Sequence, residues 1–132
     1  MKKNKMILKE IENILECKNL TGKELLTREI EYCYATDMMS DVLKSCKIGS
    51  LLITGLVNQQ VIQVAEIMDL KGIVFVSGKE PSSDIIENAK EKNMPMLSTE
   101  KNLFEACGIL YLSGLRGKEI FQKADDGAGS TI

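Results

Sequence analysis

The chain has 132 residues and a net charge of −2, from 17 basic and 19 acidic side chains, and this length predicts a single globular domain. The near-neutral charge and the 5% aromatic content argue against a nucleic-acid partner and against an anionic membrane surface. The absence of histidine excludes Ser-His-Asp and Cys-His catalysis and histidine-ligated metal sites.

The four cysteines, Cys17, Cys33, Cys46 and Cys107, are scattered, and none forms a Cys-x-x-Cys pair. No secretory signal is recognisable, and no apolar run approaches the ~18 residues of a membrane helix. We therefore expect a cytoplasmic protein with reduced thiols and with no metal or cofactor. The cysteines are interpreted as small core residues. The alternative, a four-thiolate metal or cluster site, requires the fold to gather them.

The first elements are short. Apolar residues recur at helical spacing over residues 6–17, which predicts a helix with its polar residues facing away. Residues 16–20 are compatible with a short edge strand, and a turn is expected at residues 21–24.

Strands and helices then alternate at regular intervals. The expected strands are residues 30–35, 51–54, 73–76 and 95–97, and the expected helices are 38–46, 58–68, 83–92 and 101–112. This alternation predicts an α/β fold with a mainly parallel sheet of four to five strands and right-handed crossovers. The second and third strands are continuously apolar and should be central, whereas the first is amphipathic and should lie nearer an edge.

The helix at residues 58–68 has more apolar surface than one face against a sheet requires. Two interpretations stay open: a deeply buried helix, or a helix whose second apolar flank forms a homodimer interface. The interface residues would be Val61, Ile62, Val64, Ala65 and Met68.

The last expected helix has an apolar stripe of Leu103, Phe104, Cys107, Leu110 and Tyr111, which indicates core packing. After Gly114 the sequence becomes small and polar. We expect one α/β domain over residues 1–114 and a frayed or disordered polar tail over 115–132.

Polar residues follow each of the four strands, at corners that meet on one edge of a parallel sheet. Ligands bind at this edge, where helix N-termini present free backbone N–H groups. The predicted ligand-binding residues are Thr36, Asp37, Ser40, Asp41, Thr54, Gly55, Gln59, Gln60, Ser77, Gly78, Lys79, Ser98 and Thr99.

Each corner residue also has a simpler explanation. Thr36 or Asp37, Asn58, Ser82 or Ser83, and Ser98 or Thr99 are ordinary helix N-caps, each worth ~1 kcal/mol without any ligand. The segment 72–80 is not a Walker A loop, because five residues separate its glycines and Glu follows Lys. The acidic residues of the first corner fit a helix N-terminus better than a Mg²⁺ site. No nucleophile–base pair is identifiable, so we expect no catalytic residues.

Taken together, the corners and strands carry a family resemblance that spans residues 6–114. The matching segments are Tyr34-Ala35-Thr36-Asp37-Met38-Met39-Ser40-Asp41-Val42, Leu51-Leu52-Ile53-Thr54-Gly55, Gln60 with Val64-Ala65-Glu66, Ile73-Val74-Phe75-Val76-Ser77-Gly78-Lys79-Glu80-Pro81, Met94-Pro95-Met96-Leu97 and Phe104-Glu105-Ala106-Cys107-Gly108. In these segments the chain resembles the DRTGG domain family.

The resemblance implies a three-layer α/β/α domain similar to the N-terminal domain of HPr kinase/phosphorylase, without the kinase P-loop domain. It implies a non-catalytic regulatory or assembly module. We expect a homodimer that binds a small anionic or nucleotide-like ligand at the corner edge. The alternative is a protein-interaction subunit of a redox or hydrogenase system. It rests on the apolar helix and on family context, because stand-alone members that resemble this chain belong to anaerobes and tend to be encoded near iron hydrogenase and redox genes. An enzyme acting on a phosphorylated metabolite through Asp37, Asp41 or Lys79 ranks third.

Overall fold

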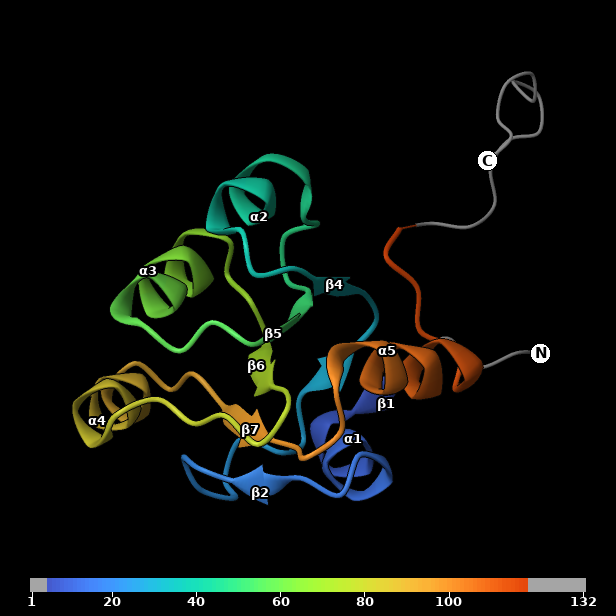
Figure 1. The fold of residues 1–132 in the computed structure, drawn as a ribbon, viewed down its shortest axis with the longest axis horizontal. Helices are drawn as coiled ribbons and strands as arrows, with labels where there is room; N and C mark the ends of the chain where they lie inside the picture. The colour runs from blue at the N-terminus through green and yellow to red at the C-terminus, as the bar shows by residue number, and fades with distance from the viewer. Residues whose placement is uncertain (1–4, 119–132) are drawn as a thin grey trace.

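The structure, a computed structural model, describes residues 5–118 and has the expected α/β architecture (Figure 1). The elements run in chain order as β1 (Met6–Ile7), α1 (Leu8–Ile14), β2 (Lys18–Asn19), β3 (Glu29–Ile30), β4 (Cys33–Ala35), α2 (Met39–Ser45), β5 (Leu51–Thr54), α3 (Gln59–Ile67), β6 (Gly72–Phe75), α4 (Ser83–Glu91), β7 (Met96–Ser98) and α5 (Leu103–Leu112). Among these residues, no helix is long and apolar enough to cross a bilayer.

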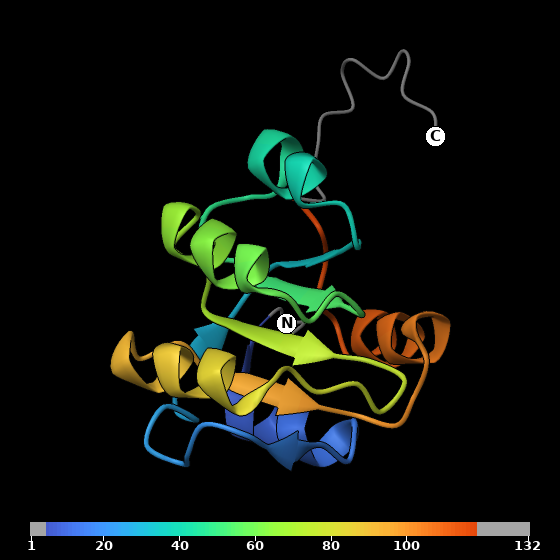
Figure 2. The same ribbon diagram turned by 60° about the vertical axis from the view of Figure 1, so that its left-hand side comes forward.

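The main sheet has five strands in the order β2-β7-β6-β5-β4. Strands β4 to β7 are parallel, and β2 pairs with β7 in the antiparallel direction. This arrangement confirms the mainly parallel sheet, the central position of β5 and β6, and the edge position of the first predicted strand. Figure 2 shows the parallel strands side by side, with their carboxyl ends on one edge.

Helices cover both faces of the sheet, which confirms the three-layer α/β/α fold (Figure 1). Successive side chains of a strand point to opposite faces. On β5, Leu52 packs with α2, α3 and α4, whereas Leu51 and Ile53 pack with α1 and α5. Because both faces are buried, the central strands need the continuous apolar runs seen in the sequence.

The N-terminal region differs from its prediction at one point. The predicted helix over residues 6–17 is shortened to α1, because Met6 and Ile7 instead pair with β3 in a separate two-stranded sheet. The first N–H groups of α1 donate to backbone oxygens of the residue 26–28 segment, which fixes where the helix starts. The predicted edge strand over residues 16–20 is present as β2.

Helix α3 is buried by its neighbours within the same chain. It lies between α2 and α4 (Figure 2), and each of them contacts one of its flanks. The five side chains predicted for a dimer interface are all at most 8% exposed: Val61, Ile62, Val64, Ala65 and Met68. Core packing therefore accounts for their apolar character, as the buried-helix interpretation required, and they provide no surface for a second copy.

Helix α5 exposes side chains that were expected in the core. Ala106 and Leu110 face the sheet, but Phe104 and Tyr111 are 86% and 58% exposed, so the core assignment of these two was wrong. The chain stays packed past residue 114, since Leu115 is buried and the Cys33 N–H donates to the Arg116 carbonyl oxygen. Most of the predicted tail, from residue 119 onward, lies outside the described residues.

Candidate functional site

Asp37 joins the ends of two neighbouring strands. It follows β4, and its Oδ1 accepts hydrogen bonds from the Thr54 hydroxyl at 2.9 Å and from the Gly55 backbone N–H at 2.7 Å. Thr54 ends β5 and is fully buried, whereas Asp37 is exposed. Hydrogen bonds to a carboxylate are stronger than neutral ones, so this pair fixes the orientation of the Asp37 carboxylate at the carboxyl edge of the sheet.

Lys79 approaches the same corner from the loop after β6. A Cβ added at Gly55 would lie 3.7 Å from Asp37 Oδ1 and 3.8 Å from Lys79 Cδ, so both side chains border the open side of this glycine. Within residues 5–118, Lys79 takes part in no ion pair. Its ammonium group is therefore available to a ligand near the Asp37 carboxylate.

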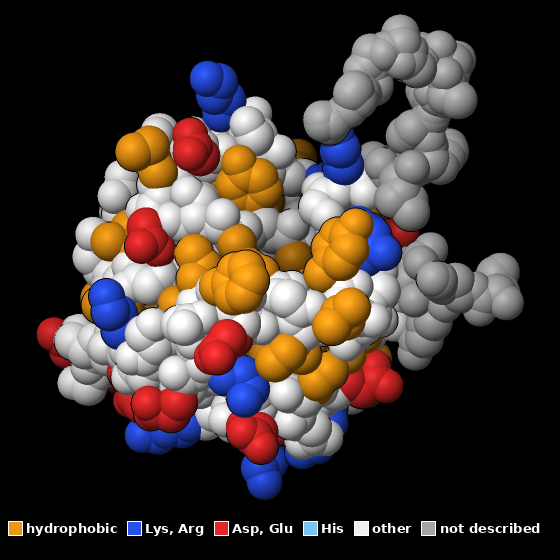
Figure 3. Space-filling view, turned by 45° about the vertical axis from the view of Figure 1, so that its right-hand side comes forward, with side chains coloured by type: hydrophobic (Ala, Val, Ile, Leu, Met, Phe, Trp, Pro, Cys, Tyr) orange, Lys and Arg blue, Asp and Glu red, His pale blue; other side chains and the backbone are white. Residues whose placement is uncertain are grey.

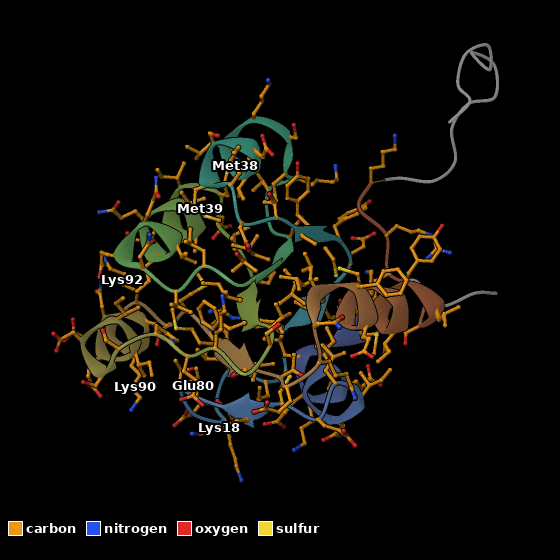
Figure 4. All side chains as sticks on the ribbon, in the orientation of Figure 1. Lys18, Met38, Met39, Glu80, Lys90 and Lys92 are labelled. Carbon is orange, nitrogen blue, oxygen red and sulfur yellow. The ribbon has the colours of Figure 1, made fainter. Side chains whose placement is uncertain are left out.

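A hollow of about 450 Å³ lies beside Asp37, at the starts of α2 and α3. Its walls are apolar at Met38, Met39 and Leu56 and polar at Asp37, Ser40, Asn58 and Gln60. Figure 4 shows Met38 and Met39 at the beginning of α2, on the side toward α3. The hollow is wide open to solvent, and like small-molecule sites it combines apolar walls with a few polar groups.

The turn at residues 77–79 offers less to a ligand than the sequence suggested. Its three backbone N–H groups all donate to carbonyl oxygens of the chain, at Lys101, Thr99 and Val76. The Glu100 carboxylate also lies close to Gly78, since a Cβ there would be 2.8 Å from Glu100 Oε1. A loop without free N–H groups cannot cradle a phosphate, so Ser77 and Gly78 lose their basis as backbone contacts. The Lys79 side chain and the exposed Ser77 hydroxyl remain available from this turn.

Ser98 and Thr99 have structural partners instead of facing the hollow. Both are buried, at 5% and 1% exposure. The Ser98 hydroxyl donates to the Lys79 carbonyl oxygen at 2.9 Å, and the Thr99 hydroxyl donates to the Leu15 carbonyl oxygen at 2.7 Å. These bonds tie the end of β7 to the Lys79 turn and to the end of α1.

The capping predictions have a mixed outcome. The Asn58 side chain caps α3 by accepting from the Gln60 N–H at 3.0 Å, as expected. At α2 the N-cap residue is Met38, so neither Thr36 nor Asp37 caps the helix. The Thr36 hydroxyl accepts from the Met38 N–H at 3.0 Å and shapes the turn. At α5 the cap is Asn102 rather than Ser98 or Thr99.

The remaining predicted residues separate into two groups. Ser40 and Gln60 line the hollow, whereas Asp41 and Gln59 do not. The structure therefore brings together Asp37, Ser40, Thr54, Gly55, Gln60 and Lys79 from the predicted set. It adds Met38, Met39, Leu56 and Asn58, whose only sequence signal was their position inside the first two corners.

The cysteines are partly or fully buried, and within the described residues they do not form a metal site. All four are free, and burial raises the pKa of Cys17 and of Cys33 to about 12. Within the described part of the chain, no three His, Cys, Asp or Glu side chains are arranged to hold a metal ion. The fold therefore does not gather the cysteines as the four-thiolate alternative requires, and Asp37 and Asp41 are not part of such a group.

Comparisons with known proteins agree with this architecture. The profile of the DRTGG domain matches residues 10–113. One similar solved structure is the CBS and DRTGG regulatory region of Clostridium perfringens pyrophosphatase, in complex with its activator diadenosine tetraphosphate. It has a TM-score of 0.65 and 19% identity, and the match covers 81% of this chain but 46% of that chain. A search of curated proteins found no match. Because the profile covers most of the sequence, the chain belongs to the DRTGG domain family.

Proposed function

We propose that this protein is a non-catalytic regulatory module that senses a nucleotide-like ligand in the hollow beside Asp37. The observation that carries the proposal is the Asp37 carboxylate, held by Thr54 and Gly55 at the open edge of the sheet. Its surroundings combine apolar side chains and amides with Lys79, which has no ion-pair partner within residues 5–118. The four free cysteines suit the expected cytoplasmic location, where thiols stay reduced.

Asp37 lies at the edge of the sheet and has a carboxylate oxygen that can accept hydrogen bonds from a sugar. The Thr54 and Gly55 hydrogen bonds both reach Oδ1, and within residues 5–118 no donor bonds to Oδ2. A carboxylate at the carboxyl edge of a parallel sheet commonly binds ribose hydroxyls. We therefore assign the ribose of the ligand to Asp37.

The rest of the hollow suits a purine base. Met38 and Leu56 provide apolar surface, and a methionine sulfur makes favourable contacts with aromatic rings. Asn58 and Gln60 carry side-chain amides, whose paired donor and acceptor match the edge of adenine. Asn58 Oδ1 accepts from the Gln60 N–H, and the Asn58 side chain keeps its NH₂ donors and the second lone pair of Oδ1 for a ligand.

Lys79 is assigned to a phosphate. Its ammonium is a point charge on a flexible stem and has no ion-pair partner in residues 5–118. The Asp37 carboxylate repels anions that bind close to it. An anion alone is therefore a poor ligand, whereas a nucleoside with its phosphate directed toward Lys79 satisfies both charges.

The solved regulatory region supports adenine nucleotides as the first probes, because it is complexed with diadenosine tetraphosphate. Isothermal titration of the full chain with adenosine, AMP, ATP and diadenosine tetraphosphate tests the proposal. We expect Asp37→Asn to weaken all four ligands at least tenfold. Lys79→Gln should weaken only the phosphorylated ligands, by a similar factor, since adenosine does not use the lysine.

Glu91→Gln is the matched control, because Glu91 is exposed on α4 and lies outside the hollow. It should leave every affinity unchanged. Absence of binding by all four probes would remove the adenine-nucleotide assignment. If Asp37→Asn and Glu91→Gln lose ligand affinity equally, the ligand does not bind beside Asp37.

A second candidate function is a protein-interaction subunit of a redox or hydrogenase system. The exposed apolar side chains of α5 favour a protein contact of some kind. Affinity capture from an extract of the source organism, with Leu112→Glu as the control bait, tests it. A redox enzyme retained by the wild type and released by the variant would support this second function.

A further inference from the structure

The outer face of α5 is an apolar stripe that the rest of the described chain leaves uncovered. We call Phe104, Gly108, Tyr111 and Leu112 the α5 stripe. Phe104, Tyr111 and Leu112 are 86%, 58% and 88% exposed. Figure 3 shows hydrophobic side chains gathered on the face of the molecule where α5 lies. The residues recur at helical spacing, so they form one continuous surface along the helix.

Gly108, at the middle of the stripe, has no internal reason to be glycine. A Cβ added there would meet no other atom within 4 Å. Glycine in a helix interior costs about 1 kcal/mol relative to alanine. A glycine with open space above it is suited to close approach by a second helix, because the distance between packed helices depends on the side chains at their crossing point.

We propose that the α5 stripe is the interface of a homodimer in which two copies of α5 cross in antiparallel directions at Gly108. A two-fold interface must be self-complementary. Phe104 and Leu112 lie four residues before and four residues after Gly108. A two-fold axis at the glycine therefore places Phe104 of one copy against Leu112 of the other, on both sides of the axis.

The charges beside the stripe are complementary under the same symmetry. Glu105 precedes the glycine by three residues, and Tyr111 follows it by three. The Arg116 guanidinium lies 3.7 Å from the centre of the Tyr111 ring. In the antiparallel pair, the carboxylate of Glu105 in one copy therefore comes next to the Arg116 guanidinium of the other. The two-fold axis repeats this ion pair.

The area is appropriate for the core of such an interface. At 150–250 Å² for an aromatic side chain, the three exposed side chains present roughly 400 Å² of mostly apolar surface. A standard interface buries ≈ 800 Å² on each partner, with an apolar centre and a polar rim. The stripe supplies about half of one side, and the half-buried Leu103 and Cys107 adjoin it.

Sedimentation equilibrium of the full chain at micromolar to millimolar concentration tests the dimer. We expect a mass twice the 14.7 kDa of one chain. Leu112→Glu should raise the dimer dissociation constant at least about 30-fold, the usual effect of removing an interface hot spot. The matched control is Ile67→Glu, because Ile67 is 66% exposed on α3 and away from the stripe, and it should leave the constant unchanged.

Disulfide trapping tests the geometry. Under mild oxidation, Gly108→Cys should form a covalent dimer, because two copies of residue 108 meet at the axis. Leu112→Cys alone should not, but Leu112→Cys mixed with Phe104→Cys should. Wild type under the same oxidation measures any background from the four native thiols.

Several outcomes would overturn the proposal. A wild type that stays monomeric at millimolar concentration removes the dimer. A dimer unaffected by Leu112→Glu, or a Leu112→Cys variant that cross-links to itself, removes the antiparallel crossing at Gly108. A monomer in which the Leu112→Cys thiol becomes reactive only after deletion of residues 119–132 assigns the stripe to the chain's own C-terminal segment. These results do not depend on ligand binding, so they leave the proposed ligand-sensing function as a separate question.

Discussion

Replacement of Asp37 by alanine tests whether the carboxylate holds the site together. The substitution removes two hydrogen bonds, from the Thr54 hydroxyl at 2.9 Å and from the Gly55 N–H at 2.7 Å. Thr54 is fully buried, so in the variant its hydroxyl loses its acceptor in a place that water reaches poorly. The Gly55 N–H lies closer to solvent and can donate to water instead.

The expected loss follows from these two environments. A hydrogen bond to a charged group contributes about 1.5–3 kcal/mol, and leaving a buried polar group unsatisfied costs about 1–3 kcal/mol. Because Asp37 itself is exposed, the lower value of each of these two ranges applies. We therefore expect a loss of about 2–3 kcal/mol in the free energy of unfolding. For a domain of this size, that corresponds to a fall of roughly 10 °C in Tm.

Urea unfolding followed by far-ultraviolet circular dichroism measures the free energy. Glu91→Ala is the control, because it removes an exposed carboxylate that has no hydrogen bond or ion pair in residues 5–118. A double-mutant cycle with Thr54→Val should show a coupling of about 1 kcal/mol, since both changes remove the same bond. A coupling near zero, or a loss in Asp37→Ala no larger than in Glu91→Ala, would refute the reasoning.

Three further predictions concern the scaffold. Thr99→Val should lower the free energy of unfolding by about 1–3 kcal/mol, because the Leu15 carbonyl oxygen loses its buried donor, and it should leave titration of the hollow unchanged. Gly78→Ala should cost about 1 kcal/mol or more, measured by urea unfolding, because φ is +72° at this position; Gly108→Ala, in an ordinary helix, should show no such loss in the monomer. Burial raises the pKa of Cys17 and Cys33 from 9.0 to about 12, so the folded state keeps protons that the unfolded state releases. The free energy of unfolding should therefore fall as the pH rises from 9 toward 12, and the stabilisation from the two protonated thiols should be fully present below pH 9. If the free energy of unfolding of the wild type falls no more than that of Cys17→Ala between pH 9 and 12, this prediction is wrong.

The positions of the central strands could be predicted because their physical signal is local. A strand covered by helices on both faces must be apolar at every position, and residues 51–53 and 73–76 are. The short strands β1 and β3 carry no such signal, since two residues cannot show a period. Their pairing depends on hydrogen bonds from the start of α1 to the residue 26–28 segment, which is a tertiary contact.

The candidate site was predictable as an edge but not as a set of contacts. Topology alone places the four corners on one edge. The sequence cannot show whether a hydroxyl already has a hydrogen-bond partner within the protein. The Thr99 hydroxyl has one, because it donates to the Leu15 carbonyl oxygen, 84 residues away. In the same way, the sequence suggested that Asp37 caps a helix. Its actual partner, the Gly55 N–H, is 18 residues away and follows β5, so this bond cannot be inferred from local sequence.

The apolar pattern of a helix also leaves its partner unspecified. Helix α3 and helix α5 both have more apolar residues than one buried face needs. The sequence left deep burial and a dimer surface both open for α3 and suggested a core for α5, and the structure shows burial within the chain for the first and exposure of Phe104 and Tyr111 for the second. The difference is set by position, because α3 lies between two helices and α5 has the sheet on one side only.

The antiparallel pairing of β2 with β7 has a consequence for synthesis of the protein. Lys18 is opposite Ser98, and the Met96 N–H donates to the Thr21 hydroxyl, so the early segment is completed only by residues near the end of the domain. On the ribosome, residues 18–21 must wait without these partners until nearly the whole domain has emerged. Contacts between residues far apart in sequence also slow folding. This segment precedes most of the domain in the sequence, yet it should be among the last parts of the domain to reach their final structure, and until then it is exposed to chaperones and proteases.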